Sequence, residues 1–174
     1  MNVEIVKTGY LKENCYILTK NNNCIIIDPG DDQEKIKEII GNKKVLAILV
    51  THYHFDHVGA LEELKKYYDV KVIDYNSYDI EKIGDFSFLI IRTPGHKEDS
   101  VTYYFKEYKK MFVGDFIFRG TIGRCDLEGG NIKDMKNSLN IIKKYDKDVK
   151  LYPGHGDITT IGYELEYNPY LRGE

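Results

Sequence analysis

The chain has 174 residues, of which 42% are hydrophobic and 30% are charged, and its formal net charge is −3. This length suits one domain or at most two very small ones, and the composition is typical of a globular protein and excludes a disordered chain. A nucleic-acid binder usually carries a basic face, so the weakly acidic balance disfavours that class. We expect one domain over residues 1–174 and no nucleic-acid partner.

The cysteine count and the absence of apolar segments indicate a cellular location. Cys15, Cys24 and Cys125 form an odd set without a Cys-x-x-Cys pair, unlike a secreted disulfide framework. The first residues lack the pattern of a signal peptide, and no apolar run approaches the about 20 residues of a membrane span. We therefore expect a soluble, cytoplasmic protein with free thiols and no membrane partner.

Strands are expected where short apolar or β-branched runs occur, and several of them end at Gly, Pro or Asp. Taken in chain order, they are Val3–Val6, Cys15–Leu18, Cys24–Ile27, Val45–Val50, Val70–Ile73, Phe86–Ile91, Val101–Phe105, Met111–Val113 and Val149–Tyr152. Helices are expected over residues 32–41, 58–67 and 131–144, where apolar residues recur at helical spacing. The helices fall between groups of strands, which predicts a layered α/β sandwich.

All five histidines follow expected strands, in short segments rich in Gly, Pro or Asp. The segment that follows Val50 holds His52, His54, Asp56 and His57 within six residues. His52 and His54 would point the same way in an extended chain, because they are two residues apart. Imidazole and carboxylate ligands together suit zinc, and also iron or manganese. This segment therefore predicts a metal-binding loop.

Three more strand ends each carry a possible ligand: His96, Asp115 and His155. We expect the four strand ends to converge on one edge of a sheet, which is where sites are built in layered α/β proteins. The predicted ligands are His52, His54 and His96 for one metal, Asp56, His57 and His155 for the other, and Asp115 as a bridge. Such a centre keeps an open position for water or hydroxide, as catalytic zinc sites do.

With these motifs the sequence resembles the metallo-β-lactamase fold superfamily, in its glyoxalase II-like branch. The matching segments are Asn14-Cys15-Tyr16, IIIDPG (25–30), THYHFDH (51–57), TPGH (93–96), VGD (113–115), GTIGRCDLEGG (120–130), PGHG (153–156) and TTIGYELEYNPYL (159–171). The resemblance implies a four-layer αββα sandwich with a dinuclear metal site between its two sheets, and hydrolysis of thioesters, typically acylated glutathione. It also implies that Asp28 orients the metal loops, where a simple Asp-Pro-Gly turn is the alternative.

Two features depart from that branch and concern the thiol part of the substrate. Glyoxalase II carries a C-terminal helical segment that helps to hold glutathione, whereas this chain has room for one short helix after His155. The branch usually has small residues after the TPGH histidine, whereas this chain has Lys97-Glu98-Asp99. Neither departure touches the predicted metal ligands.

The ligand set predicts two zinc ions, with iron or manganese as alternatives, and metal-assisted hydrolysis of a small-molecule substrate. A thiolate leaves without a proton donor because its conjugate acid has a pKa of about 8.5, which favours a thioester over an amide. Asp56 and Asp115 are the expected catalytic residues, Asp56 orienting the attacking hydroxide and Asp115 bridging the metals. Arg124 is expected to bind a substrate carboxylate, with an ion pair to Asp126 as the alternative.

Other functions can use similar ligands. A lactonase or esterase would share all seven, and a mono-iron persulfide dioxygenase could use His52, His54, His96 and Asp115. A nuclease is disfavoured by the net charge, and a flavodiiron oxidoreductase by His54 and the missing flavin domain. A metal-binding regulatory or scaffold domain would fit better if one of the seven ligands were lost.

Overall fold

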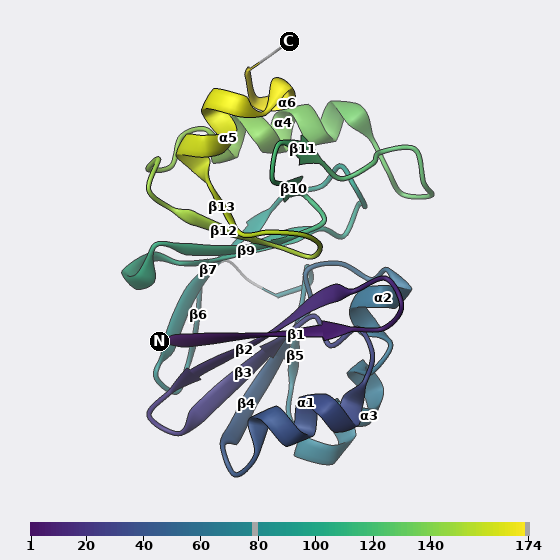
Figure 1. Ribbon diagram of the computed structural model, residues 1–174, viewed down its shortest axis with the longest axis vertical. Helices are drawn as coiled ribbons and strands as arrows, with labels where there is room; N and C mark the ends of the chain where they lie inside the picture. Colours follow the sequence, from purple (N-terminus) through teal and green to yellow (C-terminus); the bar gives the residue numbers. More distant parts are fainter. Residues whose placement is uncertain (78–79, 173–174) are drawn as a thin grey trace.

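The computed structural model describes residues 1–77 and 80–172, which form two sheets packed face to face (Figure 1). The five-stranded sheet consists of β1 (Asn2–Thr8), β2 (Glu13–Lys20), β3 (Asn23–Ile27), β4 (Lys44–Leu49) and β5 (Val72–Ile73), in that order. The six-stranded sheet has the order β13 (Thr159–Thr160), β12 (Lys150–Pro153), β9 (Lys110–Gly114), β8 (Val101–Phe105), β7 (Phe86–Arg92) and β6 (Ile80–Ile83). A small hairpin of β10 (Ile117–Phe118) and β11 (Thr121–Ile122) follows β9.

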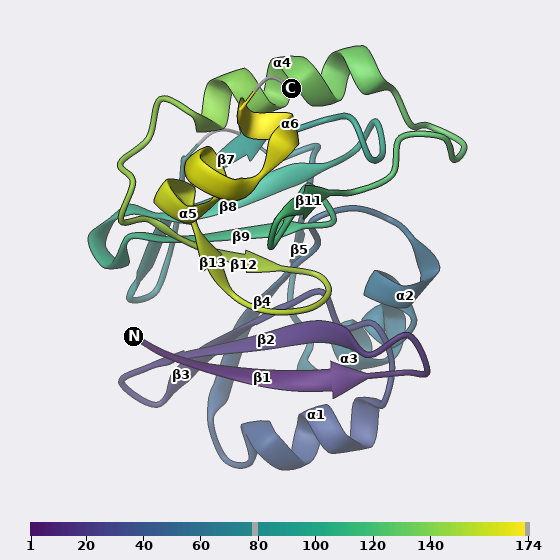
Figure 2. The same ribbon diagram turned by 45° about the horizontal axis from the view of Figure 1, so that its top comes forward.

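Helices cover the outer face of each sheet, as Figures 1 and 2 show. The helices α1 (Gln33–Ile40) and α3 (Leu61–Tyr68) lie against the five-stranded sheet, and α4 (Ile132–Ile142), α5 (Ile161–Tyr167) and α6 (Pro169–Arg172) against the six-stranded one. The short α2 (Phe55–Val58) lies at one end of the sandwich, and a 3₁₀ turn, η1 (Lys106–Tyr108), joins β8 to β9. The expected four-layer αββα sandwich is confirmed.

Each of the three spaces between layers holds its own apolar core. In β3, Ile25 and Ile27 pack between the two sheets, whereas Ile26 packs under α1 and α3. Met111 of β9 and Leu139 of α4 share the third core, on the far side of the six-stranded sheet. Successive residues of a strand point to opposite faces, so continuous apolar runs fill two cores at once.

Several short elements differ from the sequence expectations. The helix expected over 58–67 begins three residues later, as α3 at Leu61, because Ala60 N donates to Pro29 O at 3.0 Å instead of within a helix. The separate helix α2, over Phe55–Val58, is not expected. The strands β6, β10, β11 and β13 are not expected from the sequence, since they are too short to show a period. The C-terminal segment forms two short helices where one is expected, and α6 begins at Pro169, a residue that suits a first helical position. None of the helices within residues 1–77 and 80–172 is long and apolar enough to cross a membrane.

Candidate metal centre

The loop after β4 brings four of the predicted ligands to one end of the sandwich. Its start is fixed to the other sheet, because Val101 N donates to Thr51 O at 2.9 Å. His54 directly precedes α2, and Asp56 and His57 lie within that helix. The extended residues before α2 and its single turn therefore present their side chains to the same small volume.

Three histidines form the first cluster. His54 Nδ1 lies 3.1 Å from His52 Nε2 and 2.8 Å from His96 Nε2. His52 and His96 are buried, and the three ligand atoms lie within 4.8 Å of one another. Three ring nitrogens at this spacing can bind one metal ion.

The second cluster combines a carboxylate with two histidines, and Asp115 lies between the two clusters. His155 Nε2 is 3.1 Å from Asp56 Oδ2, and His57 Nε2 is 3.9 Å from the same oxygen. Asp115 Oδ1 lies 3.3 Å from His57 Nε2, and its Oδ2 lies 3.6 Å from His96 Nε2 and 3.7 Å from His155 Nε2. Asp115 thus lies between the clusters, with Oδ2 near a histidine of each, as a bridging ligand requires.

The strand ends that carry these ligands come from both sheets. β4 belongs to the five-stranded sheet, whereas β7, β9 and β12 belong to the six-stranded sheet. The expectation that four strand ends meet at one edge of a single sheet is therefore wrong. The ligands gather where the ends of two stacked sheets meet, which agrees with the family resemblance.

Asp28 holds two of the metal-facing histidines through its carboxylate. Its Oδ2 accepts a hydrogen bond from His57 Nδ1 at 3.0 Å and another from Thr51 Oγ1 at 2.6 Å. Because that hydroxyl proton is donated to Asp28, Thr51 Oγ1 is left as the acceptor for His52 Nδ1, 3.1 Å away. These assignments leave the Nε2 lone pairs of His52 and His57 directed at the clusters.

His96 is oriented by the backbone of Arg124. His96 Nδ1 donates to Arg124 O at 2.7 Å, which also leaves its Nε2 free for the first cluster. The side chain of Arg124 is exposed and makes a bidentate pair with Asp126, with Nε–Oδ1 at 2.7 Å and Nη2–Oδ2 at 2.8 Å. The structure therefore brings the backbone of Arg124 to the centre and turns its guanidinium to a neighbour on the surface.

Two atoms in the centre are buried without a hydrogen-bond partner among the described residues: His57 Nε2 and Asp115 Oδ1. Their separation is 3.3 Å, but their geometry is not that of a hydrogen bond. Buried polar atoms are rarely left unsatisfied, because the loss of solvation costs on the order of 1–3 kcal/mol. A metal ion bound by both atoms satisfies them, so the donor set fits a metal.

The electrostatics of the centre depend on burial and on the mixture of charges. Burial opposes the charged form of His57, but the nearby carboxylates of Asp115 and Asp28 outweigh it and raise the pKa of this imidazole. Burial, followed by repulsion from neighbouring histidines, lowers the pKa of His52 well below its usual range. Burial raises the pKa values of Asp56 and Asp115, but the neighbouring histidines lower them by more. The net effect is that both pKa values are lowered. Both carboxylates are therefore ionised, as metal ligands must be.

Two side chains of β2 hold the loop that carries His155. Asn14 Nδ2 donates to Pro153 O at 2.9 Å and to Gly156 O at 3.1 Å, and Tyr16 Oη donates to Pro153 O at 2.6 Å. Asn14 and Tyr16 lie two apart on one face of the strand, so that alternation is the sequence signal that could have identified them. The sequence expectations include this segment only as a match to the family.

A buried carboxyl group lies beneath the second cluster and is also missed by the sequence expectations. Glu13 Oε2 accepts a hydrogen bond from Thr8 Oγ1 at 2.8 Å, and its Oε1 lies 3.8 Å from His57 Nδ1. Burial, partly offset by the attraction of His57, raises the pKa of Glu13 to about 9. Glu13 is therefore a neutral acid at pH 7.

Helix α4 supports the loop that carries His96. Ser138 Oγ donates to Pro94 O at 2.7 Å, and Asn131 N donates to Gly95 O at 2.8 Å. A Cβ on Gly95 would lie 2.5 Å from the Cα of Met135, so this close approach requires glycine.

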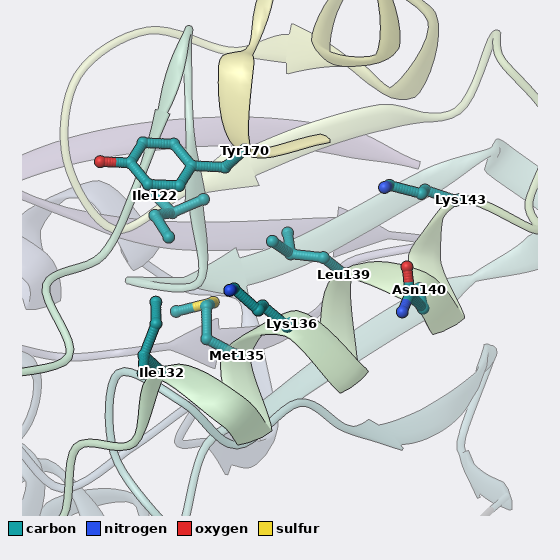
Figure 3. A pocket seen from close by; sticks show the side chains of 8 residues that line it. All are labelled: Ile122, Ile132, Met135, Lys136, Leu139, Asn140, Lys143 and Tyr170. Carbon is teal, nitrogen blue, oxygen red and sulfur yellow. The ribbon is translucent and has the colours of Figure 1, made fainter. Parts of the chain in front are cut away.

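A separate pocket of about 290 Å³ lies on the outer layer beside α4. Figure 3 shows Tyr170 and Ile122 across this pocket from Met135 and Lys136. The described residues that line it include lysines and apolar side chains but no histidine or carboxylate. This pocket therefore offers none of the side-chain types that form the two clusters.

Comparison with known proteins agrees with the geometry. The family profile of the metallo-beta-lactamase superfamily matches residues 8–81 and 70–155. Hydroxyacylglutathione hydrolase GloC of Haemophilus influenzae (strain ATCC 51907 / DSM 11121 / KW20 / Rd) is 31% identical over 213 aligned positions, which cover 100% of both chains. This chain is therefore similar along its whole length to a hydroxyacylglutathione hydrolase.

Two solved structures share the fold closely. The crystal structure of BLEG-1 B3 metallo-beta-lactamase is 29% identical, covers 98% of this chain and 99% of its own, and superposes with a TM-score of 0.93. TTHA1623 in a di-iron-bound form is 32% identical, with a TM-score of 0.88 and coverage of 97% of this chain and 100% of its own. The fold of this family implies a dinuclear metal site, and the clusters described above lie where such a site requires ligands.

Proposed function

The chain belongs to the metallo-beta-lactamase superfamily, and on that basis we propose that it is a dinuclear metal hydrolase that cleaves small acyl thioesters. One observation carries the proposal: two clusters of three ligand side chains lie side by side, with Asp115 between them. We propose that residues 1–174 act as one hydrolase domain.

The proposed ligands are the seven residues predicted from the sequence. His52, His54 and His96 would hold one ion, Asp56, His57 and His155 the other, and Asp115 would bridge them. We propose zinc, because imidazole and carboxylate suit it, and keep iron or manganese as alternatives since a similar protein is known in a di-iron-bound form. When bound, two such ions polarise a carbonyl group and lower the pKa of a coordinated water to about 7.

Asp56 and Asp115 supply the other groups that this hydrolysis requires. Asp56 is half-buried, ionised and 3.1 Å from His155, so it can orient a water molecule as well as bind metal. Asp115 is ionised and lies near histidines of both clusters, so it would bridge the two ions. A thiolate leaving group, whose conjugate acid has a pKa of about 8.5, needs no dedicated proton donor.

The similarity to a hydroxyacylglutathione hydrolase supports acylated glutathione or a related thiol as the substrate. Arg124 remains a proposed contact for a substrate carboxylate, and it must leave its pair with Asp126 to make it. Because both partners of that pair are exposed to solvent, its loss costs little.

The proposal includes a cytoplasmic location and a small-molecule substrate, without a nucleic-acid or membrane partner. The free state of Cys15, Cys24 and Cys125 supports a reducing compartment.

The first experiment measures the metal content of the purified chain and its hydrolysis of S-lactoylglutathione, an acyl-CoA, a homoserine lactone and a β-lactam. We expect close to two ions per chain and turnover of a thioester, which His54→Ala reduces at least about 1,000-fold by removing a ligand. Tyr67→Ala, a substitution of an exposed aromatic residue on α3, is the control and should retain both metal and activity.

The same panel separates the alternatives. Turnover of the lactone alone would move the protein to the lactonases. One iron per chain with oxygen uptake on glutathione persulfide and no hydrolysis would identify a persulfide dioxygenase. A folded sample that binds no metal would refute the proposal.

A further inference from the structure

Two hollows of opposite character adjoin the metal centre. One, of about 260 Å³, lies on the Asp56 side and is lined mainly by Tyr10, Leu11, Phe55 and glycine backbone, with Thr8, Asp31 and Asp56 as its polar members. The other, of about 450 Å³, lies on the His54 side and is lined by charged groups, among them Lys97, Glu98 and Glu128. A substrate that reaches both ends of the centre therefore meets an apolar surface at one end and a charged surface at the other.

The apolar hollow is formed by side chains that are exposed although they are large and hydrophobic. Tyr10 is 79% exposed, Phe55 is 65% exposed and Leu11 is 43% exposed. Single exposed apolar residues are common, but three that line one hollow beside a reactive centre are typical of a binding surface. Phe55 lies between two proposed ligands, His54 and Asp56, so its position is tied to the metal centre.

The turn that carries Tyr10 and Leu11 is held in place. Gly9 N donates to Asp32 Oδ2 at 3.0 Å, and Lys12 N donates to Gly9 O at 3.4 Å. A pocket wall that is fixed before binding loses little entropy when a ligand is bound.

Three glycines, Gly9, Gly30 and Gly59, form part of the wall of the hollow. A Cβ on Gly30 would lie 1.9 Å from Asp56 O, and a Cβ on Gly59 would lie 2.2 Å from Gly30 O. Glycine at both positions therefore lets the loop of Gly30 pack directly against the backbone of residues 56–59, next to Phe55.

We propose that this apolar hollow binds the acyl chain of the thioester substrate, so that the enzyme prefers medium-length apolar acyl groups to short polar ones. This inference rests on the proposed function. The volume of the hollow, about 260 Å³, suits a medium-length acyl chain. The charged hollow next to His54 then receives the thiol half of the substrate, which is the half that carries polar and charged groups.

The test uses the full chain loaded with zinc and a series of N-acetylcysteamine thioesters with acetyl, butyryl, hexanoyl and octanoyl groups. The leaving thiol is constant, so differences in kcat/KM report binding of the acyl chain. We expect kcat/KM to rise roughly two- to fourfold per methylene up to hexanoyl, because each buried methylene contributes about 0.8 kcal/mol. Phe55→Ala should lower the hexanoyl-to-acetyl ratio about tenfold.

The matched control is Tyr170→Ala. Tyr170 is an aromatic residue that is 48% exposed and lines the pocket of similar volume beside α4 (Figure 3). This substitution should leave the dependence on acyl length unchanged.

A second measurement does not depend on turnover. Calorimetry with the zinc-loaded protein should show hexanoate binding at least about 16-fold more tightly than acetate, from about twofold or more for each of four methylenes, and Phe55→Ala should lower that ratio about tenfold. Cleavage of all four thioesters at equal kcat/KM would overturn the inference and leave the proposed function intact. Cleavage of none, with hexanoate still bound more tightly, would refute the proposed function and leave an apolar site. Equal binding of the two acids would overturn the inference.

Discussion

Asp28 and His57 form a buried pair, with Oδ2 of the carboxylate 3.0 Å from Nδ1 of the imidazole. The same carboxylate accepts bonds from the backbone and hydroxyl groups of Thr51, at 2.7 and 2.6 Å. One side chain thereby sets the proton positions of two histidines that face the metal centre.

We predict that Asp28→Asn lowers the affinity for zinc about 10- to 100-fold. The amide nitrogen that replaces one carboxylate oxygen cannot accept a hydrogen bond, so the bonds from Thr51 and His57 cannot all be kept. Competition with a chromophoric chelator measures the affinity. Asp69→Asn is the control, since Asp69 is exposed and its left-handed φ of 51° suits asparagine. Equal zinc affinities of the wild type and Asp28→Asn would show that Asp28 only forms the Asp-Pro-Gly turn and does not orient the histidines.

Zinc affinity should fall as the pH falls, because a proton and a metal ion compete for His57 Nε2. The pKa of His57 in the metal-free protein is raised, so the competition already begins at neutral pH. We expect up to about a tenfold loss of affinity per pH unit below that pKa, measured by chelator competition between pH 6 and 8. Asp28→Asn removes one of the charges that raise this pKa and should move the onset to lower pH. An affinity independent of pH would contradict this role of His57.

Glu13 should make the metal-free protein less stable at higher pH. Its pKa in the folded protein is about 9, well above its ordinary value near 4.5. A raised pKa contributes stability that is fully present below the unfolded value and is lost as the pH rises through the folded value, here between about 4.5 and 9. His57 acts with the same sign over its own range, because its pKa is also raised.

Glu13→Gln keeps the shape of the side chain without the ionisation. We expect it to raise the Tm of the metal-free protein at pH 8.5 by about 3 to 8 °C and to flatten the dependence of Tm on pH. Thermal melts between pH 5 and 9 measure both, with the exposed Glu38→Gln as the control. Parallel curves for Glu13→Gln and the wild type would show that Glu13 does not titrate in this range.

Gly154→Ala should empty the metal centre. The added Cβ would lie 2.3 Å from Asp115 Oδ1 and 2.5 Å from His57 Cε1, so at least one of these groups must move. We expect the metal content to fall from two ions to fewer than one per chain and the free energy of unfolding of the metal-free protein to fall by about 1–3 kcal/mol.

Gly156→Ala is the comparison for that substitution. Gly156 has a φ of 76°, but a Cβ there meets no atom of the described residues within 4 Å. The substitution Gly156→Ala should lower the free energy of unfolding by about 1 kcal/mol through backbone strain and leave the binding of both metal ions unchanged. Elemental analysis and thermal melts of the two variants would contradict the prediction if both bound metal equally well.

The predicted ligands could be found from the sequence because each lies in a short motif directly after a strand. Their hydrogen-bonding partners could not, because those contacts join distant segments. Asp28 and Thr51 are 23 residues apart, and Asn14 and Pro153 are 139 residues apart. No local pattern encodes such a pairing, and without a family resemblance Asp28 is only the first residue of a turn.

The layered fold could be predicted because continuous apolar runs require burial on both faces. The division of the two sheets could not, since a strand such as β4 has the same composition as strands of the other sheet. The break between α2 and α3 depends on the bond from Ala60 N to Pro29 O, which the helical period of the side chains does not reveal.

The distribution of the predicted ligands over two sheets has a consequence for the folding of the chain. His57 comes from the first half of the chain and His155 from near its end, and Asn14 fastens the second loop to the first sheet. During synthesis the candidate ligands of residues 52–57 emerge first, and the clusters stay incomplete until His96 and His155 are in place. Binding of metal at both clusters would therefore report that the two sheets have come together.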